Sequence, residues 1–139
     1  EKKLAKTIAR MSKGGIPVSL FIDPDLEQVQ ASLDIGATFV ELHTGSYADA
    51  ADDREQEHQF DLIRTAAEEA YVLGLRVNAG HGLTRENLPL LHVVPHLEEL
   101  NIGHSIISRA VFVGLENAVK EILQAMEGYA GGSRPAGVA

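Results

Sequence analysis

Residues 73–83, LGLRVNAGHGL, decide the fold, because a β-strand expected over Leu75–Ala79 runs directly into the turn Gly80–Gly82. Glycines lack a Cβ, so they let the backbone turn sharply and approach a ligand closely. His81 stands between the two glycines and would project from the C-terminal end of the strand. Residues 97–107, LEELNIGHSII, repeat the order of strand, glycine, histidine and helix start. Two strands that each end in a Gly-His pair indicate one shared site.

Helices and strands alternate along the rest of the chain. We expect strands over 17–23, 38–43, 75–79 and 99–102, and helices over 2–12, 25–35, 48–73, 85–94, 105–112 and 115–129. This alternation predicts right-handed βαβ units and a parallel sheet. Thr44–Tyr47 is expected to be a loop, and Asp23, Thr84 and Ser105 are expected to be helix N-caps. The last helix is expected to bury Leu115, Val119, Ile122 and Met126.

Each expected strand has one apolar face and one mainly polar face. The polar faces carry Ser19, Phe21 and Asp23; Phe39, Glu41 and His43; Arg76, Asn78 and Gly80; and Glu99, Asn101 and Gly103. An open doubly wound sheet is covered by helices on both sides, which favours two apolar faces. A polar face that must be enclosed fits the interior of a (β/α)8 barrel. There Arg76 is expected to pair with Glu41 or Glu99, because buried charges need partners.

The predicted fold class is therefore α/β, a (β/α)8 TIM barrel of which the chain supplies about half. A complete barrel needs eight strands and about 250 residues, whereas this chain has 139 residues. The chain begins at Glu1 rather than Met, and its first residues already have a helical pattern, so we expect a C-terminal portion of a longer protein. Residues 1–130 are interpreted as the C-terminal half of one barrel domain, and residues 131–139 as a flexible tail.

The amino-acid composition limits the classes of molecule that the chain can be expected to bind. The formal net charge of −8 argues against nucleic acid or an anionic membrane surface, since both require clustered Lys and Arg, but it is compatible with small phosphorylated ligands. The chain contains no cysteine, which excludes disulfides and thiolate chemistry. We find no apolar run near 18 residues and no signal-peptide pattern, so we expect a cytoplasmic protein.

Four motifs carry a family resemblance. FIDPD at 21–25, FVELHTGSYAD at 39–49, LGLRVNAGHGLT at 73–84 and LEELNIGHSIISRAVFVGL at 97–115 resemble, in order and spacing, the C-terminal half of the pyridoxine 5′-phosphate synthases. The resemblance covers roughly residues 15–126. It implies a (β/α)8 barrel with extra helices, including a short one after the last strand, in which these strands are the fifth to the eighth.

The resemblance also implies an activity. The family condenses 3-amino-2-oxopropyl phosphate with 1-deoxy-D-xylulose 5-phosphate to give pyridoxine 5′-phosphate, phosphate and water, without a metal or organic cofactor, as a homo-octamer. By motif position, His81 would be the proton donor and Glu41 would stabilise charge in the transition states. Gly82, Gly103 and His104 would contact the aminoketone phosphate. The family's other catalytic residues lie on the first four strands, so the 139 residues alone are expected to be inactive.

The chemistry of these residue types agrees with those roles, although simpler interpretations stay open. Imidazole exchanges protons near neutral pH, as repeated imine formation and dehydration require, but His81 could also be a loop histidine. Glu41 could stabilise an iminium or form an ion pair with Arg76. A helix that starts after Gly103 and His104 is typical of a phosphate site, unless Ser105 merely caps it.

His43 shares a face with Glu41, and its role is left unassigned.

Three alternatives accompany the synthase hypothesis: a metal site, another sugar-phosphate barrel enzyme and a non-catalytic half-barrel. His43, His81 and His104 could converge on a metal, but glycines flank two of them and no carboxylate pair accompanies them, so no metal is expected. The chain could also belong to another sugar-phosphate barrel enzyme or be a non-catalytic phosphate-binding half-barrel. The absence of Lys from the four strands counts against a Schiff-base aldolase.

Overall fold

Four parallel strands form one sheet in the order β1-β2-β3-β4. The computed structural model describes residues 2–129 and 131, so the predicted tail lies outside the described residues beyond its first position. The elements are α1 Lys2–Lys13, β1 Ser19–Ile22, α2 Leu26–Asp34, β2 Phe39–His43, α3 Gly45–Ala48, α4 Asp53–Val72, β3 Arg76–Gly80, the 3-10 helix η1 Leu88–Val93, β4 Leu97–Asn101, α5 His104–Val113 and α6 Leu115–Ala125. The predicted α/β class with a parallel sheet is confirmed.

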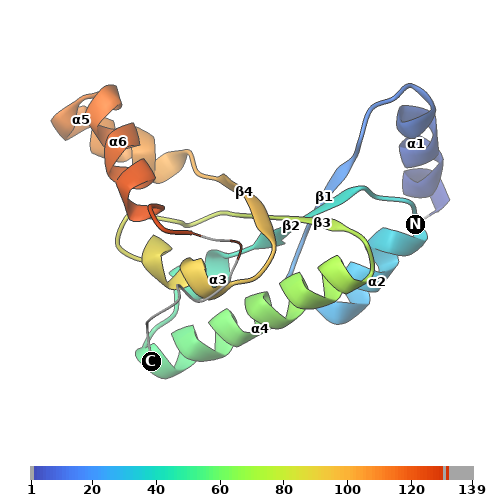
Figure 1. Ribbon diagram of the computed structural model, residues 1–139, viewed down its shortest axis with the longest axis horizontal. Helices are drawn as coiled ribbons and strands as arrows, with labels where there is room; N and C mark the ends of the chain where they lie inside the picture. Colours follow the sequence, from blue (N-terminus) through green and yellow to red (C-terminus); the bar gives the residue numbers. More distant parts are fainter. Residues whose placement is uncertain (1, 130, 132–139) are drawn as a thin grey trace.

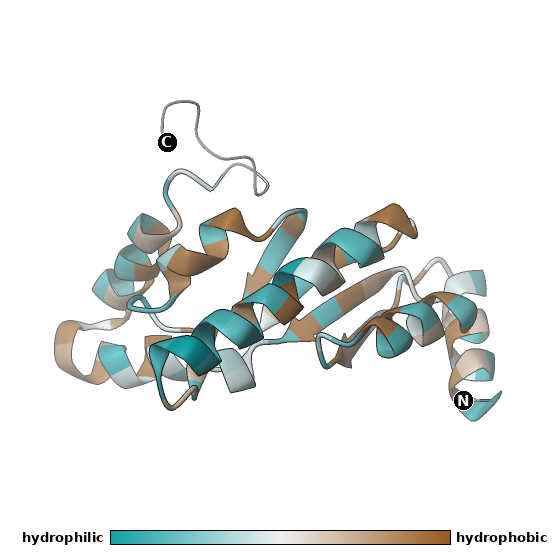
Figure 2. Ribbon diagram, turned by 90° about the horizontal axis from the view of Figure 1, so that it is seen from below, coloured by the Kyte–Doolittle hydropathy of each residue, from teal (hydrophilic) through white to brown (hydrophobic). Residues whose placement is uncertain are grey.

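The core lies between the sheet and two helices. Figure 1 shows α2 and α4 on the same side of the sheet, whereas α1 and the pair α5–α6 lie at opposite ends of the molecule. The buried residues of this layer come mainly from β2, β3 and α4: Val40, Leu42, Val77, Ala79, Ile63, Ala66, Ala67 and Ala70. In Figure 2, seen from below, α4 is largely hydrophilic, and the strands behind it alternate between hydrophobic and hydrophilic residues. The alternation places the apolar strand faces against α2 and α4.

The polar strand faces form rows across the other side of the sheet. Phe21 pairs in register with Glu41, Glu41 with Asn78, and Asn78 with Glu99. One step nearer the carboxyl ends, His43 pairs with Gly80 and Gly80 with Asn101. These rows confirm that the residues predicted on the polar faces share one side of the sheet.

Several predicted boundaries are wrong. The expected loop at Thr44–Tyr47 contains the short helix α3, and the segment 48–73, expected to be mostly helical, is interrupted at 49–52. Asp52 ends the interruption because its side chain accepts a hydrogen bond from the Glu55 N–H (2.9 Å) and so caps α4. The helix expected over 85–94 is a 3-10 helix beginning at Leu88. Asp25, not Asp23, caps α2.

The predicted partner of Arg76 is also wrong. Arg76 lies at the start of β3 and bonds to Glu98, with its Nε 2.9 Å from both carboxylate oxygens. The register between β3 and β4 shifts at this point, since Leu97 pairs with Val77 and Glu99 pairs with Asn78. Glu98 is therefore the extra residue of an irregular ladder, which turns its carboxylate toward Arg76 at the exposed edge.

The helices α5 and α6 pack mainly against each other rather than over the sheet. Of the four residues predicted to be buried on the last helix, Ile122 is buried and Met126 is half-buried, but Leu115 is 57% and Val119 37% exposed. No residue of α5 is buried. Within the described chain, β1 and β4 each pair on one side only. The sheet edges and these apolar side chains are thus left uncovered.

Candidate functional site

The turn after β3 is held by a threonine from the end of β2. The Thr44 N–H donates to the Gly80 carbonyl (2.9 Å), and the buried Thr44 hydroxyl lies 2.9 Å from the Gly80 carbonyl oxygen and 2.5 Å from that of His81. His81 has a φ of 84°, which L side chains rarely adopt. Surrounding contacts must hold such a conformation in place. His81 therefore stands exposed on a turn that Thr44 fixes.

The Glu41 side chain extends from β2 over Gly80, at the carboxyl end of β3. The side chain is half-buried on the open face of the sheet. A Cβ at Gly80 would lie 2.5 Å from the Glu41 Oε1 and 3.0 Å from both the Cβ and the carbonyl oxygen of Asn101. Gly80 thus leaves the space that the Glu41 carboxylate occupies. This close approach is the physical reason for a glycine at the first position of the turn.

The other glycine of the turn packs against α3. A Cβ at Gly82, whose φ is 74°, would lie 2.6 Å from the Ala48 Cβ. The predicted loop at Thr44–Tyr47 is thus a compact helical turn against which the histidine loop sits. Tyr47 is completely buried there, and its hydroxyl donates to the Asn87 carbonyl (2.6 Å), tying α3 to the segment before η1. Burial raises the pKa of Tyr47 above its usual value.

The amino end of α5 is open at Gly103. Gly103 occupies the N-cap position without a side-chain cap, and nothing lies within 4 Å of where its Cβ would be. The predicted cap by Ser105 is wrong, because its hydroxyl donates instead to the Leu83 carbonyl (2.6 Å). That bond ties the beginning of α5 to the turn after β3. The positive end of α5 and the exposed His104 remain available to an anion.

All five predicted site residues line one hollow of about 480 Å³ at the carboxyl ends of the strands. We call it the mouth hollow. Its wall contains Phe21, Glu41, His81, Gly82, Leu83, Thr84, Asn101, Ile102, Gly103, His104 and Ser105. The ionisable groups of this wall are one carboxylate and two imidazoles. Such a set can transfer protons and stabilise a developing positive charge next to an anion site.

Six of the lining residues were not predicted as site residues, and three of these, Phe21, Thr84 and Asn101, bring aromatic or polar side chains. Phe21 and Asn101 were placed on the polar strand faces, and register with Glu41 and Gly80 was the signal that marks them. Thr84 follows the glycine turn, and its hydroxyl lies 3.3 Å from the Glu86 amide nitrogen and 3.4 Å from that of Asn87. These side chains add aromatic, amide and hydroxyl surface to the wall.

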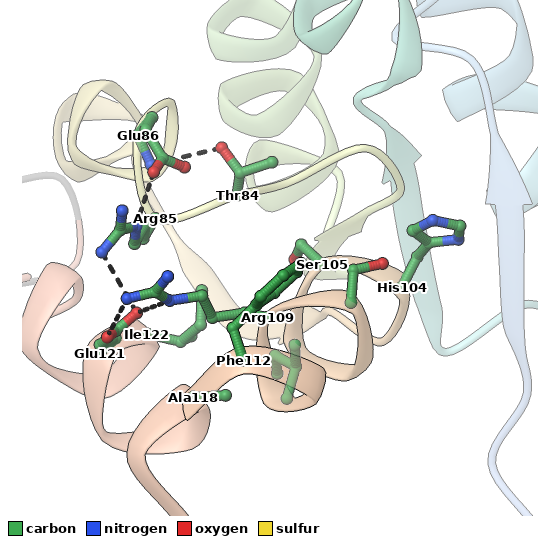
Figure 3. Close-up of a pocket in the computed structure, with 12 residues that line it drawn as sticks. Thr84, Arg85, Glu86, His104, Ser105, Arg109, Phe112, Ala118, Glu121 and Ile122 are labelled. Atoms are coloured by element: carbon green, nitrogen blue, oxygen red, sulfur yellow. Dashed lines mark hydrogen bonds and ion pairs between the residues drawn. The ribbon is translucent and has the colours of Figure 1, made fainter. Parts of the chain in front are cut away.

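A second hollow of about 430 Å³ lies between the loop after β3 and the helices α5 and α6. Figure 3 shows its charged residues paired with one another: Arg85 and Arg109 both reach Glu121. The pairing raises the pKa of Arg109 and lowers that of Glu121. Its remaining wall is largely apolar, with Phe112, Ala118 and Ile122. His104 lines both hollows, whereas Glu41 and His81, which form no ion pair with a described residue, line the mouth hollow and not this one.

No group of three or more His, Cys, Asp or Glu side chains in the described part of the chain is arranged to hold a metal ion. No described helix is both long and apolar enough to cross a membrane.

The sequence also matches known proteins. A family model described as "Pyridoxal phosphate biosynthesis protein PdxJ" matches residues 1–128. The chain belongs to this family. Curated relatives named "Pyridoxine 5'-phosphate synthase" include one from Akkermansia muciniphila, 53% identical over 128 residues that cover 91% of this chain and 52% of that protein. Another, from a Synechococcus species, is 52% identical over 124 residues that cover 89% of this chain and 52% of that protein.

The predicted resemblance is therefore confirmed at the level of the family. The chain spans about half the length of the curated relatives it matches, 52% in both examples. The four motifs that carried the resemblance lie inside the matched residues 1–128.

Proposed function

We propose that this chain supplies half of the active site of a pyridoxine 5′-phosphate synthase. The reaction joins 3-amino-2-oxopropyl phosphate to 1-deoxy-D-xylulose 5-phosphate and releases phosphate and water. The observation that carries the proposal is the convergence of His81, Glu41, Gly82, Gly103 and His104 on one hollow. Membership in the family supports the same activity.

In the proposed reaction, His81 is the proton donor. Its imidazole is exposed at the mouth hollow, where a bound substrate can reach it. Closing the pyridine ring requires loss of water, and a hydroxyl leaves more readily when an acid protonates it. The rigid, left-handed turn holds the donor at a fixed place relative to β3.

Glu41 stabilises positive charge in the same hollow. Condensation of the amine with a ketone passes through a cationic iminium, and a carboxylate beside it lowers the free energy of that state. The position of the carboxylate over Gly80 supports this role, because it lies on the open face and not against Arg76. Gly82, Gly103 and His104 bind the aminoketone phosphate at the start of α5.

The complete site belongs to a (β/α)8 barrel. Support comes from the two unpaired sheet edges at β1 and β4 in the described chain and from the open polar face. The apolar side chains of α5 support it as well, since Ile107, Val111 and Phe112 are 61%, 79% and 82% exposed. Four further βα units would pair with both edges and enclose the mouth hollow. By the family resemblance, such barrels assemble as homo-octamers.

The test uses a chimera in which this chain replaces the matching half of the Akkermansia muciniphila relative. The chimera should form pyridoxine 5′-phosphate when it is supplied with both phosphorylated substrates. Circular dichroism and a cooperative melting curve establish that it is folded, and sedimentation velocity measures its assembly. A folded chimera that forms no product contradicts the proposed function. Phosphate binding without turnover would instead support the non-catalytic half-barrel.

A further inference from the structure

His43 contacts the imidazole of His81 without lining the mouth hollow. The two ring centroids are 4.8 Å apart with an interplanar angle of 37°. The wall of the mouth hollow includes His81 but not His43. His43 is therefore placed to act on His81 and not directly on a substrate in the mouth hollow.

The ring of His43 is itself confined from several sides. Phe21 contacts it edge-on, with centroids 5.2 Å apart and an interplanar angle of 80°. A Cβ at Gly45 would lie 2.6 Å from the His43 Cε1 and 2.8 Å from its Nε2, so the start of α3 presses closely against the ring. The Asp23 carboxylate lies 3.8 Å from the His43 Nδ1. Residues from β1, the loop after it and α3 thus fix the ring.

The backbone and the side chain of His81 are held by different residues. Thr44 binds the His81 carbonyl and so fixes the main chain of the turn. Among the described residues, we find no hydrogen bond to the His81 ring. Gly45 approaches it, since a Cβ there would lie 3.1 Å from the His81 Cδ2. The His43 ring and this glycine therefore both limit rotation of the His81 imidazole.

We propose that His43 is a positioning residue that holds the His81 imidazole in its working orientation by packing of the two rings. The proposal rests on the proposed function, in which His81 is the proton donor. Aromatic faces and edges pack at such separations with a preferred orientation. Proton transfer needs the donor within hydrogen-bond reach of the reacting atom, so a ring that rotates freely donates less often.

The test compares two replacements of His43 in the active chimera. His43→Ala removes the ring and should lower kcat by roughly ten- to a hundredfold, with KM for both substrates nearly unchanged. His43→Phe retains an aromatic ring and should restore most of the lost kcat. His58→Ala, at an exposed position of α4, is the matched control and should leave both constants unchanged.

The outcomes separate this inference from the proposed function. An active unmodified chimera whose kcat is unaffected by His43→Ala overturns the positioning role and leaves the function standing. Equal losses in His43→Ala and His43→Phe also overturn it, because a nitrogen of His43 would then be needed. If His43→Ala does not fold, His43→Gln provides the comparison with His43→Phe. An inactive but folded unmodified chimera speaks against the proposed function itself.

Discussion

The two ends of β3 are built in opposite ways. At the amino end, Arg76 pairs with Glu98 and its guanidinium lies 4.2 Å from the centre of the Phe39 ring. Nearby, Tyr71 and His96 stack with their ring centroids 3.6 Å apart. At the carboxyl end, His81 is exposed in a left-handed conformation beside the Glu41 carboxylate.

The difference separates stability from chemistry. Side chains at the amino end form ion pairs and ring contacts with one another, so few of their polar groups are available to bind a ligand. At the carboxyl end, the backbone makes the internal hydrogen bonds, and the ionisable side chains face the mouth hollow. In (β/α)8 barrels, the carboxyl ends of the strands carry the active site, whereas the opposite end contributes stability. Changes at the carboxyl end should therefore lower turnover, whereas changes at the amino end should lower stability.

The largest effect is expected from His81→Asn in the chimera. Loss of the proton donor should reduce turnover by about 10²- to 10⁴-fold. Asparagine tolerates a positive φ, so the melting temperature should stay near that of the unmodified chimera. Steady-state assays and thermal melts measure both quantities. Retention of full turnover would remove His81 from the mechanism.

Two glycines, Gly80 at the carboxyl end of β3 and Gly74 just before its amino end, provide the sharpest comparison. Gly80→Ala places a Cβ 2.5 Å from the Glu41 Oε1, so the carboxylate must move and kcat should fall by about 10²-fold. Gly74, at the amino end, has a φ of 86° with nothing within 4 Å of its Cβ position.

Gly74→Ala should therefore destabilise the fold by about 1–2 kcal/mol, because an L side chain is strained at that φ. Its kcat below the melting temperature should be unchanged. Denaturant titrations and kinetic assays of both variants test the comparison. Similar kinetic losses in the two variants would show that the two ends are not functionally distinct.

A smaller effect is expected where α3 meets the segment before η1. Tyr47→Phe removes the hydroxyl that donates to the Asn87 carbonyl and should reduce the free energy of unfolding by about 1 kcal/mol. The buried ring stays in place, so turnover should change little. Urea denaturation of the chimera measures the loss. A large fall in kcat without a loss of stability would assign Tyr47 to the chemistry instead.

The smallest effect is expected from Glu98→Gln at the amino end. The hydrogen bond from Arg76 holds the pKa of Glu98 below its usual value of 4.5, against the opposing effect of burial. A lowered pKa in the folded state stabilises the protein above the unfolded-state pKa, and this contribution is lost as pH falls through the folded-state value.

The unmodified chimera should therefore melt slightly higher than Glu98→Gln at neutral pH. The difference should shrink as the pH falls below about 4.5, the unfolded-state pKa of this carboxyl group. Because both side chains of the pair are substantially exposed, the difference should also decrease in high salt. Melting curves at several pH values and salt concentrations measure it. A difference that grows toward low pH would contradict the assignment.

The alternation of helices and strands was sufficient to predict the parallel sheet, and the alternation of side chains along each strand predicted the face that carries Glu41. The strand-end glycines led to His81, Gly103 and His104, because local sequence determines where a parallel strand ends and its loop begins. The roles of these residues stay predictions. The motif that includes Thr44 indicated a loop, since a single helical turn such as α3 leaves too short a hydrophobic pattern to detect.

Other features depend on contacts between distant segments. The partner of Arg76 is set by a shift in register between β3 and β4, which no local pattern records. The exposure of Leu115 follows from α6 packing on α5 rather than on the sheet. The ring contact between His43 and His81 joins the end of β2 to the turn after β3, so residue type alone left His43 unassigned.

The hydrogen bonds of Thr44 have a consequence for protein engineering. Because Thr44 hydrogen-bonds to the carbonyls of both Gly80 and His81, the loop after β2 and the turn after β3 form one structural unit. A designer who grafts the histidine turn onto another barrel must transfer residues 41–48 together with residues 78–83. Either segment alone would lack the Thr44 hydrogen bonds that fix the conformation of the histidine turn.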